Sequence, residues 1–413
     1  MTFHSLLRER HTPSTAGMDG AVHGICDTVS RESSAHFGAG FRALILTGSL
    51  ARGEGSFVEE DGKYVALSDA EFLLVLHSHR ALPPDAEVTE LIRRIQTSLT
   101  GCGILCKVSV GVCHDDFLRR LQPRVFSHEL RCHGRVIAGE QEILRLIPPF
   151  LAAEIPLEDG WQTLANRITE QLSLAGELNG CPDTLSPEAQ YQSIKFVLDM
   201  ATSFLLFAGL YAPSYRERAE RILQLSRQPG NETWPLDLCE FAALVARCTS
   251  WKLSPGSRGD VGYAFWSEAL RHAEKLWSWE LAQLTGGGAG TANDPMARWM
   301  RRQALAARMR GWLYVFRRQE KEGLSPVLRR FLSGGWRHSP RYGVYAAASR
   351  LFFRLPSFVA PGNSSSPDVF SEARDISATL PLWRNGKPEH ASWQELAAEI
   401  IWNYNRFLVE TRS

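Results

Sequence analysis

The segment spanning residues 44–76 constrains the fold of this chain more than any other. An apolar run, "LILT", ends at Gly48 and Ser49, and a small, charged segment follows it. A second apolar run, "AEFLLVL", then begins directly after Asp69 and contains Glu71. Short apolar runs bounded by turn residues are typical of buried strands. The pattern therefore predicts two strands of one sheet, with a tight turn at the Gly-Ser pair and two carboxylates at the start of the second strand.

The neighbouring segments supply the other elements that such a sheet needs. Apolar residues at helical spacing predict helices over residues 18–36 and 84–99. A further strand is predicted at Ile104–Val112 ("ILCKVSVGV"), and "RVIAGE" near residue 138 closes the series. This order of helices and strands predicts one α+β domain over residues 1–150.

Beyond Pro149 the pattern changes to apolar residues spaced three and four apart, which predicts a helical second half. The glycine-rich segment "LTGGGAGTANDP", residues 284–295, is typical of a linker, and a second break is predicted at residues 356–368. We therefore expect a helical domain over residues 151–284 and a basic, aromatic-rich helical region over residues 285–413.

Composition limits the classes of function. The 413 residues are 44% hydrophobic and carry a formal net charge of +1, so the chain as a whole has no strong attraction for nucleic acid or anionic membranes. The sequence contains no apolar stretch long enough to span a bilayer and no signal-peptide pattern, so we expect a cytoplasmic protein without a transmembrane segment. Eight cysteines without a Cys-x-x-Cys pair indicate reduced thiols rather than a zinc site.

The Gly-Ser turn and the two acids together predict a site for a metal and a phosphate. Side chains two apart on a strand point to the same side, so Asp69 and Glu71 would lie about 6 to 7 Å apart on one face. Two carboxylates at that spacing suit Mg²⁺, which keeps its other positions for water and phosphate oxygens. Gly48 and Ser49 would begin a helix, whose backbone N–H groups and serine hydroxyl would bind phosphate.

These residues carry a resemblance to a known family. The segment "LTGSLARGEG" followed by "SDAEFLLVL" resembles the signature of the DNA polymerase β-like nucleotidyltransferase superfamily, over about residues 40–76. The resemblance implies an α+β fold in which an N-terminal nucleotidyltransferase-like mixed sheet with helices precedes a large α-helical region. It also implies that Gly48 and Ser49 contact the β- and γ-phosphates, that Asp69 and Glu71 bind Mg²⁺, and that Arg52 neutralises phosphate.

The sequence departs from the family pattern in two ways. The spacer between turn and acids is longer than usual and contains a hairpin-type insertion around Asp61 and Gly62. Active members also carry a third acid on a later strand, which activates the acceptor hydroxyl as a general base. The matching strand here, "CKVSVGV", offers Lys107 and Ser109 instead. The acids that remain as candidates are Asp115, Asp116 and Glu129.

Two features of the helical half suggest binding partners for the protein. Lys195 is polar in an apolar helix and would either reach the γ end of the triphosphate or pair with Asp199 one turn away. Residues 298–354 are basic and interleaved with aromatic side chains. Such a segment would bind nucleic acid, bind an anionic lipid surface, or form a solvated basic face whose apolar side packs internally, and the pattern favours the last. In that last case Leu305, Met309, Leu313 and Phe316 would be the packed side chains.

The sequence thus predicts a metal-dependent nucleotidyltransferase that transfers a nucleotidyl group from an NTP to an unidentified small molecule, protein or RNA and releases pyrophosphate, with ATP among the candidate nucleotides. Because no third catalytic carboxylate is evident, the alternative is a catalytically impaired relative that binds nucleotide or acts as a regulatory or interaction module. A third hypothesis is a scaffold protein in which the motif has no function.

Overall fold

The computed structural model describes residues 13–230, 233–255, 261–286, 294–317, 324–332, 335–359, 373–384 and 392–409. The chain forms two compact units that alternate along the sequence. The first unit comprises Met1–Asp159, Ala208–Arg227 and Ala242–Gly259, and the second comprises Gly160–Phe207, Gln228–Phe241 and Asp260–Ser413. The Gly-Ser turn and the two carboxylates both belong to the first unit.

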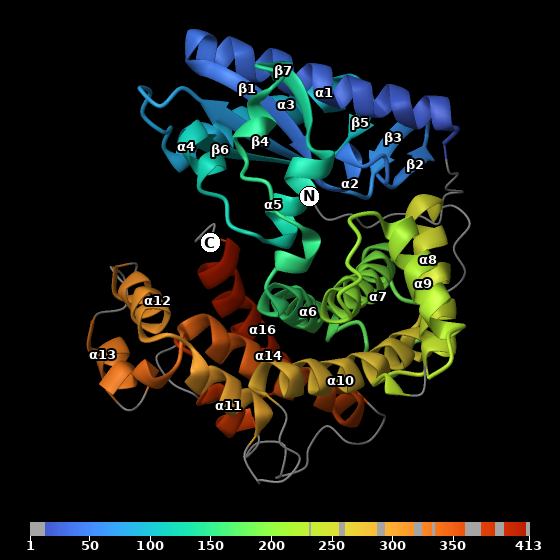
Figure 1. The fold of residues 1–413 in the computed structure, drawn as a ribbon, viewed down its shortest axis with the longest axis vertical. Helices are drawn as coiled ribbons and strands as arrows, with labels where there is room; N and C mark the ends of the chain where they lie inside the picture. The colour runs from blue at the N-terminus through green and yellow to red at the C-terminus, as the bar shows by residue number, and fades with distance from the viewer. Residues whose placement is uncertain are drawn as a thin grey trace. The chain divides into compact units, whose positions relative to one another are not determined.

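A four-stranded mixed sheet forms the centre of the first unit (Figure 1). Its strands are β1 (Phe41–Thr47), β4 (Ala70–Leu76), β6 (Val108–His114) and β7 (Arg135–Gly139), in the order β6-β4-β1-β7. Strand β1 is antiparallel to β4 and β7, whereas β4 and β6 are parallel. A parallel pair needs a crossover connection, which helix α3 (Asp85–Gly101) supplies.

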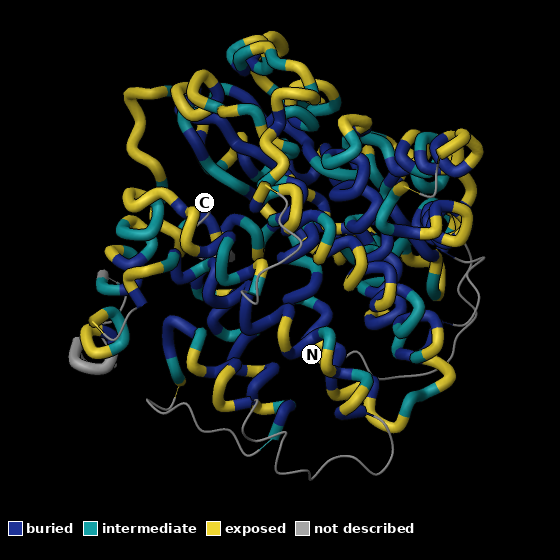
Figure 2. The backbone as a smooth tube through the Cα atoms, turned by 60° about the horizontal axis from the view of Figure 1, so that its bottom comes forward, coloured by how far each residue is buried: buried dark blue, intermediate teal, exposed yellow. Residues whose placement is uncertain are grey.

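Helices cover both faces of this sheet, which explains why its strands are apolar almost without interruption. Because side chains alternate along a strand, Leu44 and Leu74 point to one face, where they pack with α1 and α3. Ile45 and Leu73 point to the other face and pack with α4 and α5. Most residues of β1 and β4 are buried, and buried segments are dark blue in Figure 2. Of these covering helices, α1 spans Thr15–Phe37, α4 spans Asp115–Arg119 and α5 spans Val125–His133.

The long spacer forms part of a second, three-stranded sheet. Strands β2 (Phe57–Glu60) and β3 (Lys63–Ala66) pair as an antiparallel hairpin. Its two turn residues, Asp61 and Gly62, have φ values of 51° and 70°, the left-handed conformation that a two-residue hairpin turn requires. The predicted hairpin is therefore confirmed. Strand β5 (Ile104–Leu105) adds to β3, so the strand predicted over Ile104–Val112 is divided between two sheets.

Two later segments complete the first unit. Helix α8 (Tyr215–Ser226) belongs to it, as does α9 (Leu238–Leu253) from residue 242 onward. The carboxylate of Glu54, in the spacer, accepts hydrogen bonds from the Ser214 hydroxyl at 2.7 Å and from the Tyr215 backbone N–H at 3.1 Å. A negative charge at the first turn of a helix is favourable, so Glu54 fixes the start of α8 against the spacer.

The described part of the second unit is helical. Its helices are α6 (Leu157–Gln171), which enters the unit at residue 160, α7 (Pro187–Phe207), α10 (Tyr263–Thr285), α11 (Pro295–Arg302), α12 (Leu305–Arg317), α13 (Leu324–Leu332), α14 (Pro340–Val359) and α16 (Trp393–Tyr404). Aromatic rings hold several of them together. The fully buried Trp161 ring stacks on Tyr342 at 5.4 Å and contacts Trp277 and Tyr345.

The breaks predicted in this half are only in part described. Helix α10 ends at Thr285, and Gly286 follows in the left-handed conformation that commonly ends a helix; residues 287–293 of the predicted linker lie outside the described residues. The second break was expected from residue 356, yet α14 continues through Pro356 to Val359. A proline so close to a helix end interrupts few backbone hydrogen bonds, and residues 360–372 again lie outside the described part.

The predicted fold class is confirmed: an N-terminal mixed sheet with helices precedes a large helical region. The predicted domain limits at residues 150 and 284 stay a prediction. Within the part of the chain that the structure describes, no helix combines the length and the apolar character needed to cross a membrane.

A carboxyl group lies in the core of the second unit. Glu280 on α10 is fully buried and accepts a hydrogen bond from the Ser203 hydroxyl on α7 at 2.6 Å. Burial removes water from the charged form and raises the pKa of Glu280 from 4.5 to about 8. Glu280 is therefore protonated in the folded protein at neutral pH.

We expect Glu280→Gln to change the pH dependence of stability. Between pH 4.5 and about 8 the unfolded chain releases this proton and the folded chain keeps it, so stability falls as pH rises through that window. Each pH unit within this window lowers the free energy of unfolding of the wild-type protein by about 1.4 kcal/mol. Above the window, the total loss relative to low pH therefore reaches several kcal/mol in order of magnitude. Glutamine has no proton to lose, so the variant should keep its unfolding midpoint at pH 8.

The matched control is Glu274→Gln, at an exposed position of the same helix. Thermal unfolding of the three proteins between pH 5 and pH 9 should show the wild type and Glu274→Gln declining together, with Glu280→Gln diverging upward at high pH. Parallel curves for all three would show that Glu280 does not hold its proton.

Candidate functional site

The turn after β1 brings the two halves of the predicted motif together. Gly48 begins the one-turn helix α2 (Gly48–Ala51) and has a φ of 67°, which favours glycine. A Cβ atom on Gly48 would lie 2.8 Å from Oε2 of Glu71. Glycine therefore serves both the backbone conformation and the close approach of the carboxylate. Since α2 has only one turn, its aligned dipoles add little to anion binding, and the backbone N–H groups and Ser49 hydroxyl would carry it.

The two acids lie at the start of β4, on the face of the sheet that α5 covers. Thr47 and Glu71 are paired across β1 and β4, and the row continues through Ile45 and Leu73 in the core beneath α5. Asp69 stands just before the strand and shares this side by alternation. Both acids are exposed. The sequence reasoning treated Glu71 as a buried charge inside an apolar strand, where it would need a partner. Glu71 does lie within β4, but its expected burial is wrong, because its side chain is exposed while Ala70 and Phe72 on either side are buried.

The neighbouring strand presents a lysine and a serine beside these acids. In the parallel register of β4 and β6, Glu71 is opposite Ser109 and Ala70 is opposite Val108. Lys107 precedes β6, and its Nζ lies 3.6 Å from Oδ2 of Asp69, with the lysine side chain 76% exposed. The residues predicted from the strand "CKVSVGV" therefore do stand next to the carboxylates.

Two of the three remaining acids lie at the other end of the same sheet. Asp115 and Asp116 follow β6 at the end opposite Ser109, six or more residues along the strand, so they lie roughly 20 Å from Glu71. Asp115 is paired there with Arg42 at 2.5 Å. These two acids therefore cannot act as a base beside Glu71 in this arrangement.

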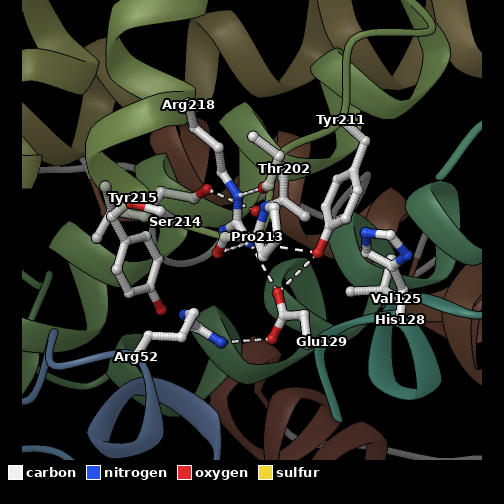
Figure 3. Close-up of polar contacts among 12 residues, drawn as sticks. Arg52, Val125, His128, Glu129, Thr202, Tyr211, Pro213, Ser214, Tyr215 and Arg218 are labelled. Atoms are coloured by element: carbon white, nitrogen blue, oxygen red, sulfur yellow. Dashed lines mark hydrogen bonds and ion pairs between the residues drawn. The ribbon is translucent and has the colours of Figure 1, made fainter. Parts of the chain in front are cut away.

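The third candidate, Glu129, lies on α5 and belongs to a buried ion network (Figure 3). One of its oxygens accepts from Arg52 at 2.5 Å; the other accepts from the Tyr211 hydroxyl at 2.7 Å and from Arg218 at 2.8 Å. The side chains of Arg52 and Arg218 are only 5% and 4% exposed. Both oxygens of Glu129 are therefore occupied by hydrogen bonds from two arginines and a tyrosine, and these contacts are those of a structural ion pair.

Arg52, predicted to neutralise phosphate, is the centre of this network. It follows α2 directly, pairs with both Glu129 and Glu54, and stacks on the Tyr215 ring at 5.4 Å. Burial lowers the pKa of Arg52, but the charges of Glu129, Tyr215 and Glu54 outweigh it and raise the pKa above its ordinary value. Arg52 is therefore permanently charged and anchors the turn to α5 and α8; its role toward phosphate stays a prediction.

Sequence reasoning missed Lys252 on α9. This lysine is 2% exposed, and its Nζ donates to the Ser68 hydroxyl at 2.6 Å and to the Ser56 hydroxyl at 2.9 Å. Ser68 directly precedes Asp69, so Lys252 fixes the chain at the point where the acidic pair begins. A signal was present in the sequence, because Lys252 continues the buried stripe of Val245 and Cys248 at helical spacing.

Lys195 lies on α7 in the second unit, so its predicted contact with the triphosphate stays a prediction. Its ammonium is 5.9 Å from the centre of the Tyr191 ring. Asp199, the alternative partner expected from the sequence, is instead paired with Arg167 at 2.7 Å. The described residues contain no group of three or more His, Cys, Asp or Glu side chains placed to hold a metal ion.

The chain is similar in structure to a known protein but matches none by sequence. No protein-family model matches the chain, and no curated protein matches it. Its structure is similar to the crystal structure of spectinomycin adenyltransferase AAD(9) from Enterococcus faecialis with ATP and spectinomycin, at 11% sequence identity and a TM-score of 0.39. The likeness covers 62% of this chain and 98% of that one. A likeness this distant identifies neither a family nor an activity.

Glu129→Gln should destabilise the first unit strongly. The substitution keeps the side chain's size but removes the negative charge that pairs with Arg52 and Arg218, and removing one partner of a buried pair costs about 3 kcal/mol or more. Tyr211→Phe is the matched comparison, because it deletes a single hydrogen bond to the same carboxylate and should cost about 1.5 kcal/mol. Chemical denaturation measures both, and equal losses would contradict the central role of Glu129.

Proposed function

We propose that this protein is a metal-dependent nucleotidyltransferase that transfers a nucleotidyl group from an NTP to an acceptor and releases pyrophosphate. The observation that carries the proposal is the close approach of the Glu71 carboxylate to Gly48. This proximity supports a site in which one polyphosphate chain would reach both the phosphate-binding turn and a metal ion at the acidic pair.

The residues at this site fit Mg²⁺. Asp69 and Glu71 are exposed carboxylates on one side of the sheet, and Mg²⁺ is commonly held by one or two carboxylates together with water and substrate phosphates. An ion held by them would offset the negative charge that the phosphate oxygens carry during transfer. Gly48 and Ser49 would bind the phosphates through backbone N–H groups and the hydroxyl, and Lys252 would keep Ser68 and Asp69 in position.

The reaction needs little covalent chemistry from the protein. An acceptor hydroxyl oxygen bonds to the α-phosphorus and its proton passes to solvent, while the bond from that phosphorus to the oxygen bridging to the β-phosphate breaks and pyrophosphate leaves. The side chains supply position and charge: the turn holds the leaving phosphates, and the acidic pair fixes the cation.

One observation supports the second candidate, a nucleotide-binding relative without turnover. Lys107 and Ser109 stand beside Asp69 and Glu71, where a base for a hydroxyl acceptor would act, and Lys107 already pairs with Asp69. Calorimetry with ATP, GTP, CTP and UTP in the presence of Mg²⁺ measures binding. Pyrophosphate release with hydroxylated small molecules, RNA and protein as acceptors measures turnover. Binding with release supports the transferase, and binding without release supports the second candidate.

The acidic pair can be tested by removing its charges. Asp69→Asn and Glu71→Gln should each weaken binding of the Mg²⁺–nucleotide complex about tenfold or more, since an interaction with a charged group is worth about 1.5–3 kcal/mol. The control is Asp116→Asn, an exposed carboxylate at the opposite end of the sheet, which should bind as the wild type does. Undiminished affinity in both site variants would refute the proposal.

The turn offers a second, independent test. Gly48 and Gly53 have φ values of 67° and 69°, so alanine strains the backbone similarly at both, at about 1 kcal/mol. At Gly53 a Cβ would meet nothing within 4 Å, whereas at Gly48 it would displace the Glu71 carboxylate. We expect Gly48→Ala to lose nucleotide affinity and Gly53→Ala to keep it, measured by the same calorimetry. If both variants keep it, the turn takes no part in binding.

A further inference from the structure

Positive charge is concentrated in one region of the second unit. Residues 295–340 contain eleven arginine and lysine residues and two glutamates, although the whole chain has a net charge of only +1. This region includes helices α11, α12 and α13 and the short helix η7 (Gly335–Arg337) (Figure 1). Such a local excess of charge attracts an anionic partner.

Helices α12 and α13 also expose large aliphatic side chains. Leu305 and Leu313 on α12 are 57% and 51% exposed, and Leu328 and Leu332 on α13 are 47% and 68% exposed. Their spacing places each pair within one arc of its helix, and exposed arginines, Arg310 and Arg329, lie beside them. The four leucines and two arginines are here called the α12–α13 face.

This exposure corrects the interpretation that the sequence favoured. The apolar side of the basic segment was expected to pack internally through Leu305, Met309, Leu313 and Phe316. Only Met309 and Phe316 are half-buried, and the two leucines point to solvent. The buried side of α12 is formed instead by Trp312 and Val315, and the Trp312 ring contacts Phe331 at 5.5 Å.

The exposed side chains favour a lipid over a nucleic acid. Nucleic-acid surfaces gain affinity by stacking bases on aromatic rings. Here Trp299 and Trp312 are buried, and the Trp312 indole N–H donates to the Gly335 carbonyl at the start of η7 at 3.0 Å. Leucines do not stack bases, but together with arginines they are typical of surfaces that lie at the boundary between lipid headgroups and acyl chains. Trp336, 42% exposed beside Arg337, suits the same boundary.

We propose that the α12–α13 face binds an anionic membrane surface, with its leucines entering the headgroup boundary and its arginines pairing with lipid phosphates. The interaction is peripheral and reversible, because the described helices include none that could cross the bilayer. The proposal is independent of the nucleotide site, since all six residues lie in the second unit.

Sedimentation of the full chain with lipid vesicles tests the proposal. We expect binding to vesicles of phosphatidylcholine mixed with phosphatidylglycerol, weak binding to phosphatidylcholine alone, and loss of binding as salt rises. No binding to either vesicle, or equal binding to both, would overturn it.

Two double variants locate the surface. Arg310→Gln with Arg329→Gln should weaken binding about twenty-fivefold, from roughly fivefold for each arginine near an anionic surface. Leu305→Ser with Leu332→Ser should reduce it further or abolish it, without disturbing the fold, because both leucines are mostly exposed. The matched control combines Leu151→Ser with Arg271→Gln, an exposed leucine and an exposed arginine elsewhere, and should bind as the wild type does.

Two other partners are outcomes of the same experiments. Fluorescence anisotropy with a labelled single-stranded RNA measures the nucleic-acid alternative, and tighter binding to RNA than to anionic vesicles would overturn the proposal. Light scattering measures a second copy of the chain as the partner. A dimer that dissociates in the Leu305→Ser, Leu332→Ser variant would show that protein, not lipid, covers this face.

Discussion

The constraint on which the proposed chemistry of the first unit depends is the close approach of the Glu71 carboxylate to Gly48. A carboxylate can approach a strand end this closely only where the facing residue has no side chain, and the positive φ of Gly48 imposes the same requirement independently. The antiparallel pairing of Thr47 with Glu71 then fixes the approach, because β1 ends and β4 begins at the same end of the sheet. Sheet register thus positions the groups that the proposed chemistry needs.

Buried ion pairs hold the segments around this contact. Arg52 lies directly after the turn, and through Glu54 and Glu129 it joins the spacer, α5 and α8. Replacing such pairs with apolar residues is often neutral for stability, so their value lies in specifying one arrangement. Each arginine and each acid here has a defined partner, and an error in the placement of any segment would leave a charge buried without compensation. We infer that the network makes the turn's position specific rather than merely stable.

The sequence predicted those features that depend on neighbouring residues. Strand β1 occupies the predicted run Phe41–Thr47, and the Asp61-Gly62 turn forms the expected hairpin, because turn chemistry and apolar runs act locally. Features that depend on distant contacts were missed. Glu71 is exposed although Ala70 and Phe72 beside it are buried, because the core on its side of β4 begins at Leu73. The pairing of Arg52 with Glu129 joins residues 77 positions apart. Lys252 was missed for the same reason. Its role depends on hydrogen bonds to Ser56 and Ser68, which lie far from it in the sequence.

The interleaved connectivity of the first unit has a consequence for synthesis on the ribosome. Its sheet is complete once residue 139 has emerged, but Glu54 and Glu129 find Ser214, Tyr211 and Arg218 only after a long stretch of the second unit has been made. Until then Glu54 and Glu129 can pair with Arg52 but lack their later partners Ser214, Tyr211 and Arg218. The order of translation therefore delays the maturation of this region until α8, and finally Lys252, leaves the exit tunnel.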